Sequence, residues 1–155
     1  MRIDHINIVV KDIEKSKRFY IDILGFEQTL ELYLDAKWME ELTGFKDPKA
    51  KCVFLEPSTK NCRIELLEYL NPKTNLVDEK TQHLLNTQGI RHIALEVDDI
   101  DTIYQKSKDF GVEFISKPIK APLELVPNGK TLCYLKAPDG VVLELAQYGL
   151  DNYSE

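Results

Sequence analysis

Residues 4–26 read DHINIVVKDIEKSKRFYIDILGF, and the pattern returns at residues 91–112 as RHIALEVDDIDTIYQKSKDFGV. Once one extra residue is allowed in the first copy, three pairs of positions align: His5 with His92, Ile13 with Ile100, and Gly25 with Gly111. An internal repeat constrains the architecture before any single element is assigned. The chain is therefore expected to contain two similar modules.

The ends of the two copies match as well. Residues 64–69 read IELLEY and residues 143–148 read LELAQY, so that Glu65 aligns with Glu144. The separation along the chain between each histidine and its glutamate is much longer than the repeat of a solenoid. Two modules with several elements each are therefore predicted, rather than an array of short repeats.

Each module is expected to begin as a strand followed by a helix. Residues 3–10 and 92–97 are short segments rich in Ile and Val, which favour strands. Asp12 and Asp99 stand at N-cap positions ahead of apolar residues with helical spacing, which predicts helices over 13–24 and 100–110. The helices are expected to end at Gly25 and Gly111.

Further strands are expected at 52–55, 62–69, 132–135 and 141–147, with turns at Asn128-Gly129 and Asp139-Gly140. The predicted fold class is α+β: two βαβββ modules, residues 1–70 and 89–149, form a curled mixed sheet within one domain of residues 1–155. A linker over 71–88 joins the modules.

Two segments break the symmetry of the repeat. Residues 31–42, ELYLDAKWMEEL, are predicted to form a short helix ended by Gly44, which either shapes a pocket with Trp38 and Met39 or packs as a surface helix. Residues 72–87 are predicted to form a linker that becomes helical from about Leu76.

The composition excludes several classes of protein. An apolar content of 43% over 155 residues is enough to build a core, and a net charge of −6 without a basic stripe argues against nucleic acid as a partner. No apolar segment has the length of a signal peptide or a membrane span, so a cytoplasmic protein without membrane contact is expected. Three scattered cysteines outside any CxxC spacing are expected to be free thiols: Cys52, Cys62 and Cys133.

Side chains alternate between the two faces of a strand, and this alternation places four polar residues on the face that points away from the helix. In residues 3–10 the Ile and Val side chains at even positions are expected to pack on the helix, which leaves His5 on the opposite face. The same count places His92, Glu65 and Glu144 away from the helix. Glu68 falls on the helix side, and Glu96 is a candidate to support the site because it shares the face of His92.

A carboxylate in mid-strand among apolar neighbours is costly to bury unless it is paired, protonated or bound to a cation. Taken singly, a strand histidine is commonly structural and a strand glutamate commonly lies on a solvated face. Equivalent positions in two copies favour a metal site instead. The nitrogen and oxygen donors of His5, Glu65, His92 and Glu144 suit one divalent ion of Ni, Co, Zn, Mn or Fe(II), rather than calcium or magnesium.

The segments DHINIVVKDIEKSKRFYIDILGF, RIELLEY, GIRHIALEVDDI and LKAPDGVVLELAQY together resemble the vicinal oxygen chelate superfamily of glyoxalases, bleomycin-resistance proteins and extradiol dioxygenases. The resemblance covers nearly the whole chain. It implies paired βαβββ modules around a metal, a small-molecule substrate and a homodimer.

Within that family, dioxygenases and fosfomycin-resistance enzymes typically need two histidines and only the final glutamate. Because it has Glu65, the chain resembles the branch of the family with four metal ligands. Its short turn from Ala137 to Gly140 is more similar to that of glyoxalase I (lactoylglutathione lyase) than to that of methylmalonyl-CoA epimerase. The resemblance implies that the ion stabilises an enediolate and that Glu65 or Glu144 is the catalytic base.

The leading prediction is a metal-dependent isomerase or lyase, with a hemithioacetal as the specific substrate and Arg63 as one candidate contact for glutathione. Three alternatives stay open. They are an Fe(II) extradiol-type dioxygenase using His5, His92 and Glu144, an epimerase of acyl thioesters, and a bleomycin-resistance-like protein that binds a small molecule without chemistry.

Overall fold

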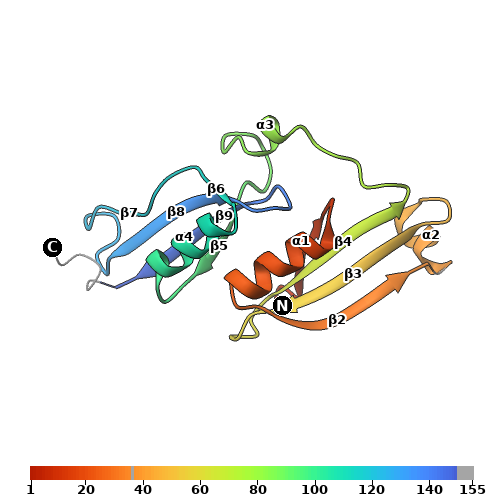
Figure 1. Ribbon diagram of the computed structural model, residues 1–155, viewed down its shortest axis with the longest axis horizontal. Coiled ribbons are helices and arrows are strands. Elements are labelled where there is room, and N and C mark those ends of the chain that lie inside the picture. Colours follow the sequence, from red (N-terminus) through yellow and green to blue (C-terminus); the bar gives the residue numbers. More distant parts are fainter. Residues whose placement is uncertain (36, 150–155) are drawn as a thin grey trace. The chain divides into compact units, whose positions relative to one another are not determined.

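The computed structural model describes residues 1–35 and 37–149. The chain divides into two compact units: the first unit is Met1–Val77, and the second unit starts at Asp78. Each unit contains one sheet and a helix beside it (Figure 1). This arrangement confirms the predicted α+β class with two modules, and the boundary between the units falls inside the segment predicted as a linker.

The first unit is a mixed four-stranded sheet in the order β1-β4-β3-β2. Its strands are β1 (His5–Val9), β2 (Glu27–Leu34), β3 (Lys49–Glu56) and β4 (Arg63–Asn71). β1 and β4 pair in parallel, whereas the other neighbours are antiparallel. This order makes the strand that carries His5 the direct neighbour of the strand that carries Glu65.

The second unit repeats this order with shorter strands. The strands are β5 (Ile93–Glu96), β6 (Glu113–Phe114), β7 (Ile119–Lys120), β8 (Lys130–Lys136) and β9 (Val142–Tyr148). The sheet runs β5-β9-β8-β6, with β7 also paired to β8, and β5 and β9 pair in parallel. Two short strands, β6 and β7, therefore lie where the first unit has the single strand β2.

The capping predictions for the main helices are confirmed. α1 (Ile13–Arg18) and α4 (Ile100–Asp109) begin after aspartates whose side chains accept backbone N–H groups: Asp12 from Lys15 at 2.9 Å and Asp99 from Thr102 at 3.0 Å. The glycines after these helices have positive φ, 73° at Gly25 and 92° at Gly111. Only glycine takes this conformation without steric cost.

The sequence predicted one helix over residues 13–24, but the α-helix ends earlier. After Arg18 it continues as a π-helix, η1 (Phe19–Ile23). Phe19 and Tyr20 are both fully buried at this point, and the ring of Tyr20 meets Phe26 edge-on with 5.6 Å between centroids. The wider turn accompanies the burial of two consecutive aromatic rings.

The helix predicted over 31–42 is wrong in its first half. Residues up to Leu34 belong to β2, which pairs with β3, and only α2 (Trp38–Thr43) is helical. Pairing to β3 satisfies backbone groups that a helix would have satisfied internally, and sequence periodicity does not register such a partner. Gly44 ends α2 with φ of 73°, as predicted.

The second prediction of a helix, from about Leu76, is wrong for most of its length. Only one turn forms, α3 (Glu79–Gln82). It starts where the Asp78 carboxylate accepts the backbone N–H of Thr81 at 3.0 Å, two residues after Leu76. Among the described residues, no helix is long and apolar enough to cross a membrane.

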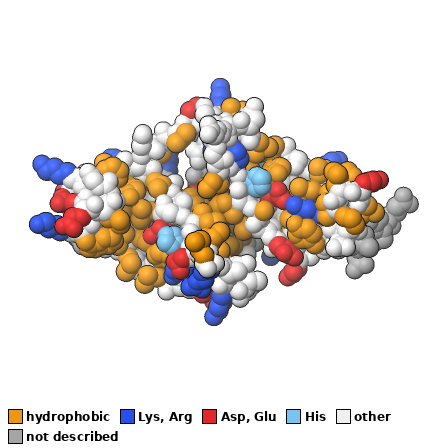
Figure 2. All heavy atoms as spheres, turned by 180° about the vertical axis from the view of Figure 1, so that it is seen from behind, with side chains coloured by type: hydrophobic (Ala, Val, Ile, Leu, Met, Phe, Trp, Pro, Cys, Tyr) orange, Lys and Arg blue, Asp and Glu red, His pale blue; other side chains and the backbone are white. Residues whose placement is uncertain are grey.

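In each unit a core lies between the sheet and the main helix, and in the first unit a further buried cluster, Met39, Ala50, Cys52 and Leu67, joins α2 to the opposite face of the sheet. The fully buried side chains include Leu55 and Leu66 in the first unit and Leu135, Leu143 and Leu145 in the second. Burial of one such side chain contributes roughly 1.5–3 kcal/mol. Other large apolar side chains reach the surface (Figure 2), among them Leu30 and Leu32 on the edge strand β2.

Candidate metal centre

The first unit brings His5 and Glu65 together, and we call this pair the first half-site. Parallel pairing of β1 with β4 places Asn7 opposite Glu65 in the register, with His5 two residues earlier on the same face. The His5 Nε2 atom lies 3.4 Å from the Glu65 Oε2 atom, and the Asn7 amide donates to the same oxygen at 2.8 Å. One nitrogen donor and one oxygen donor are thus presented side by side.

Asp4 fixes the orientation of the His5 ring. The Asp4 Oδ2 atom lies 2.9 Å from His5 Nδ1 and also pairs with the Arg63 guanidinium. The hydrogen bond from His5, and then that from Arg63, lower the pKa of the Asp4 carboxyl. A proton on Nδ1 is shared with Asp4 in this arrangement, which leaves the Nε2 electron pair available to a cation.

The remaining contacts of the first half-site come from β3. The Phe54 ring meets His5 edge-on at 5.5 Å between centroids, and the Arg63 guanidinium lies 4.8 Å from the Phe54 ring centre. The Cys52 thiol donates to Glu65 Oε1 at 3.4 Å. Both oxygens of Glu65 therefore accept hydrogen bonds from uncharged donors, Asn7 and Cys52.

The second unit brings His92 and Glu144 together in the same way, and we call this pair the second half-site. Parallel pairing of β5 with β9 places Ala94 opposite Glu144, and His92 Nε2 lies 3.5 Å from Glu144 Oε2. The Tyr134 ring meets His92 with 5.2 Å between centroids, at the place that Phe54 has in the first unit. The repeat seen in the sequence therefore extends to the geometry of each pair.

The carboxylate of the second half-site has a charged partner that the first lacks. The Lys130 ammonium lies 2.5 Å from Glu144 Oε1, and this contact raises the pKa of Lys130. Burial, followed by the hydrogen bond to Glu144, raises the pKa of Tyr134. The Glu144 side chain is only 6% exposed, against 18% for Glu65.

The structure thus places all four predicted ligands as two pairs, each within one unit. Their imidazoles are both 38% exposed, and Figure 2 shows histidine side chains at the surface with carboxylates beside them. Over residues 1–35 and 37–149, no group of three or more His, Cys, Asp or Glu side chains gathers tightly enough to hold a metal. The joint set of four spans both units and stays a prediction.

Sequence reasoning missed three supporting residues: Asp4, Asn7 and Lys130. Asn7 was within reach of the alternation rule, because it shares the face of His5. Lys130 required knowledge of the β8–β9 register. Of the two glutamates considered beside the ligands, Glu68 lies on the helix side as predicted and accepts the Ile13 backbone N–H at 3.2 Å, whereas Glu96 is exposed at the end of β5.

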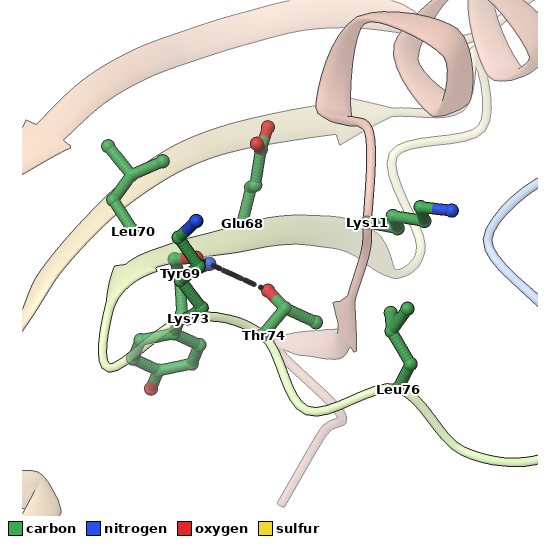
Figure 3. Close-up of a pocket in the computed structure, with 7 residues that line it drawn as sticks. All are labelled: Lys11, Glu68, Tyr69, Leu70, Lys73, Thr74 and Leu76. Atoms are coloured by element: carbon green, nitrogen blue, oxygen red, sulfur yellow. Dashed lines mark hydrogen bonds between the residues drawn. The ribbon is translucent and has the colours of Figure 1, made fainter.

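A hollow of about 370 Å³ in the first unit lies apart from the first half-site. Figure 3 shows Glu68, Tyr69 and Thr74 around it, with the Tyr69 backbone N–H donating to the Thr74 hydroxyl at 3.1 Å. Glu68 points to the opposite face of β4 from Glu65, and it also accepts a hydrogen bond at the start of α1. The hollow therefore belongs to the packing around the helix start.

One of the three thiols should react much faster than the other two in the folded chain. Burial raises the pKa of Cys52 and of Cys133 to about 12, whereas Cys62 is half-buried on the loop before β4. Because the thiolate is the reactive form, we expect Ellman's reagent at about pH 8 to modify one thiol rapidly in native protein and all three after denaturation. Cys62→Ser should abolish the rapid phase, and a rapid phase that persists in this variant would contradict the buried placement of the other two.

Comparison with protein families gives one matching model over most of the chain. Residues 2–145 match the family described as Glyoxalase/Bleomycin resistance protein/Dioxygenase superfamily. An uncharacterized protein of Bacillus subtilis, YwbC, is 31% identical over 149 residues, covering 94% of this chain and 97% of its own length. Human mitochondrial methylmalonyl-CoA epimerase is 26% identical, covering 94% of this chain and 73% of its own length.

Two solved structures show the same fold. A glyoxalase family protein from Bacillus cereus superposes with a TM-score of 0.84 at 22% identity, covering 96% of this chain and 94% of its own. Glyoxalase I from Leishmania major superposes with a TM-score of 0.64 at 19% identity, covering 95% and 86%. At these identities the structures inform the fold alone.

Proposed function

Because the chain belongs to the glyoxalase/bleomycin resistance protein/dioxygenase superfamily, we propose that it is a metal-dependent isomerase or lyase in which His5, Glu65, His92 and Glu144 hold one divalent ion. The observation that carries the proposal is the paired geometry. Each unit contains an imidazole nitrogen and a carboxylate oxygen, 3.4 Å apart in one and 3.5 Å apart in the other, on strands paired alike.

The residues fit a divalent transition metal by the chemistry of their donors. Two neutral imidazoles and two carboxylates form a mixed nitrogen and oxygen set that suits Zn, Ni, Co, Mn or Fe(II). The hydrogen bond from His5 Nδ1 to Asp4 leaves Nε2 as the donor atom, in the arrangement that commonly orients metal-binding histidines. When bound, the ion would polarise the oxygens of the substrate and stabilise negative charge developing on them.

The chain's own carboxylates supply the base. Glu65 or Glu144 accepts a proton from the carbon next to the substrate carbonyl as the carbon–hydrogen bond breaks, and the proton returns to the neighbouring carbon in an isomerisation. Asn7 and Cys52 hold the two oxygens of Glu65, while Asp4 holds His5. These contacts limit the rotation of the reacting groups, which reduces the entropy cost of reaching the transition state.

The proposed substrate is a hemithioacetal, as the resemblance to glyoxalase I-like members implies. Epimerisation of an acyl thioester is the second candidate, favoured by the alignment of methylmalonyl-CoA epimerase with 94% of this chain. The two reactions share proton abstraction next to a carbonyl. They differ in where the proton returns, to the neighbouring carbon in the first and to the opposite face of the same carbon in the second.

Proton exchange in deuterated water tests both candidates. We expect metal-loaded protein to incorporate deuterium next to the carbonyl of either the hemithioacetal of methylglyoxal and glutathione or methylmalonyl-CoA, as followed by NMR. Protein stripped of metal with a chelator should lose this exchange. Catechol cleavage that depends on Fe(II), without exchange on either compound, would favour a dioxygenase, and tight ligand binding without turnover would favour a binding protein.

A further inference from the structure

The two half-sites differ in the charge next to the carboxylate. In the second, the Lys130 ammonium contacts Glu144 Oε1 at 2.5 Å, while Oε2 remains beside His92 at 3.5 Å. The Lys130 side chain is itself only 19% exposed, and its nitrogen lies 5.5 Å from the centre of the Tyr148 ring. This lysine is therefore a packed member of the site rather than a mobile surface charge.

The lysine has no counterpart in the first unit. In the register of the second sheet Lys130 pairs with Tyr148, and the corresponding pair in the first sheet is Ala50 with Tyr69. The donors to Glu65 are an amide and a thiol, both uncharged. The first half-site has a cation too, Arg63, but it pairs with Asp4 and not with the glutamate, so the described contacts place an ammonium directly on the carboxylate in the second half-site alone.

We propose that Lys130 is a positioning residue that holds Oε1 of Glu144 and, by its charge, weakens the binding of the metal ion. The inference rests on the proposed metal centre. With the ammonium on Oε1, Oε2 on the His92 side is the oxygen of Glu144 that would hold the ion. A positive charge so close to a divalent cation opposes its binding, and in a buried setting water screens this repulsion poorly.

Removal of the lysine has two opposing effects on metal affinity. It removes a hydrogen bond that orients Glu144, which would weaken binding, and it removes the repulsion, which would strengthen it. The loss of orientation is small because the Glu144 side chain is only 6% exposed and is held by its packing on β9. Without Lys130, the buried Glu144 carboxylate lacks an ionic partner, so a bound cation stabilises it more. The charge effect therefore dominates.

The test compares two lysines on the same face of β8. Lys130 and Lys136 are the first and last residues of β8, and the even spacing between them puts both on one face of the strand. Lys136 pairs with Glu113 at 2.9 Å, outside the half-site. We expect Lys130→Met to bind Zn²⁺ about tenfold more tightly than wild type in chelator-competition titrations, because one nearby positive charge that repels the cation is removed. Lys136→Met should bind Zn²⁺ like the wild type, and so should Lys130→Arg, which keeps the charge.

Each outcome separates this inference from the proposed function. Equal or weaker Zn²⁺ binding by Lys130→Met, with normal binding by wild type, overturns the role of Lys130 and leaves the metal centre in place. No Zn²⁺ binding by wild type overturns both. Lys130→Gln keeps a hydrogen-bond donor without the charge and is expected to match Lys130→Met. It replaces that variant if circular dichroism shows that the methionine protein does not fold.

Discussion

Replacement of Glu65 by alanine is expected to remove the bound divalent ion and to lower kcat/KM by about a hundredfold or more. The side chain provides one of the four proposed ligands and is one of the two candidate bases. Its loss removes the carboxylate oxygen that His5 Nε2 and the Asn7 amide both contact, so the first half-site would keep no anionic ligand for a cation. Turnover and calorimetric metal binding on the same protein would measure the two effects.

The fold should survive this change, because Glu65 alternates with the buried Ile64 and Leu66 and its own side chain is partly exposed. Glu31→Ala is the matched control. Glu31 is also a strand glutamate of the first unit, but its carboxylate pairs with Lys17 of α1. It should retain wild-type metal binding and activity. A Glu65→Ala protein that binds the ion with unchanged affinity would remove Glu65 from the ligand set.

Leu66→Ala and Leu145→Ala are each expected to lower the free energy of unfolding by roughly 2–5 kcal/mol. The two leucines occupy equivalent positions in the repeat, each directly after the proposed glutamate ligand, and both are fully buried. Alanine leaves a cavity between sheet and helix that neighbouring side chains only partly fill. Urea denaturation followed by circular dichroism gives the change.

Leu42→Ala provides the comparison for the core variants. Leu42 lies on α2 and is 72% exposed, so its truncation should change stability by less than about 0.5 kcal/mol. If Leu66→Ala or Leu145→Ala were as mild as Leu42→Ala, the assignment of these residues to the two cores would be wrong.

Local signals in the sequence were sufficient for much of the fold. The capping roles of Asp12 and Asp99 and the positive φ of Gly25 and Gly111 follow from chemistry within one turn of each residue. The repeat then extended each assignment to a second copy. The resemblance to the superfamily is confirmed by the family match, whereas closeness to glyoxalase I-like members stays a prediction.

The failures share one physical cause, which is dependence on a distant partner. Glu31 to Leu34 were predicted as the start of a helix, yet they form part of β2, where they pair with β3. The short strands β6 and β7 likewise exist through their pairing with β8. A sequence window contains no information about such partners.

The candidate site divides in the same way. Alternation along single strands placed His5, Glu65, His92 and Glu144 on the faces opposite the helices, and each His–Glu pair meets within its unit. The contact of Lys130 with Glu144 depends on the β8–β9 register and could not be obtained from one strand. The shared ion, the catalytic base, the homodimer and the cytoplasmic location stay predictions.

The metal content of purified protein tests the shared centre most directly. Elemental mass spectrometry before and after reconstitution with Ni, Co, Zn, Mn or Fe(II) should find about one ion per chain in wild type. Because one ion would need donors from both units, His5→Ala and His92→Ala should each lose it completely. About two ions per chain, with each variant losing only one of them, or no ion under any condition, would contradict the account.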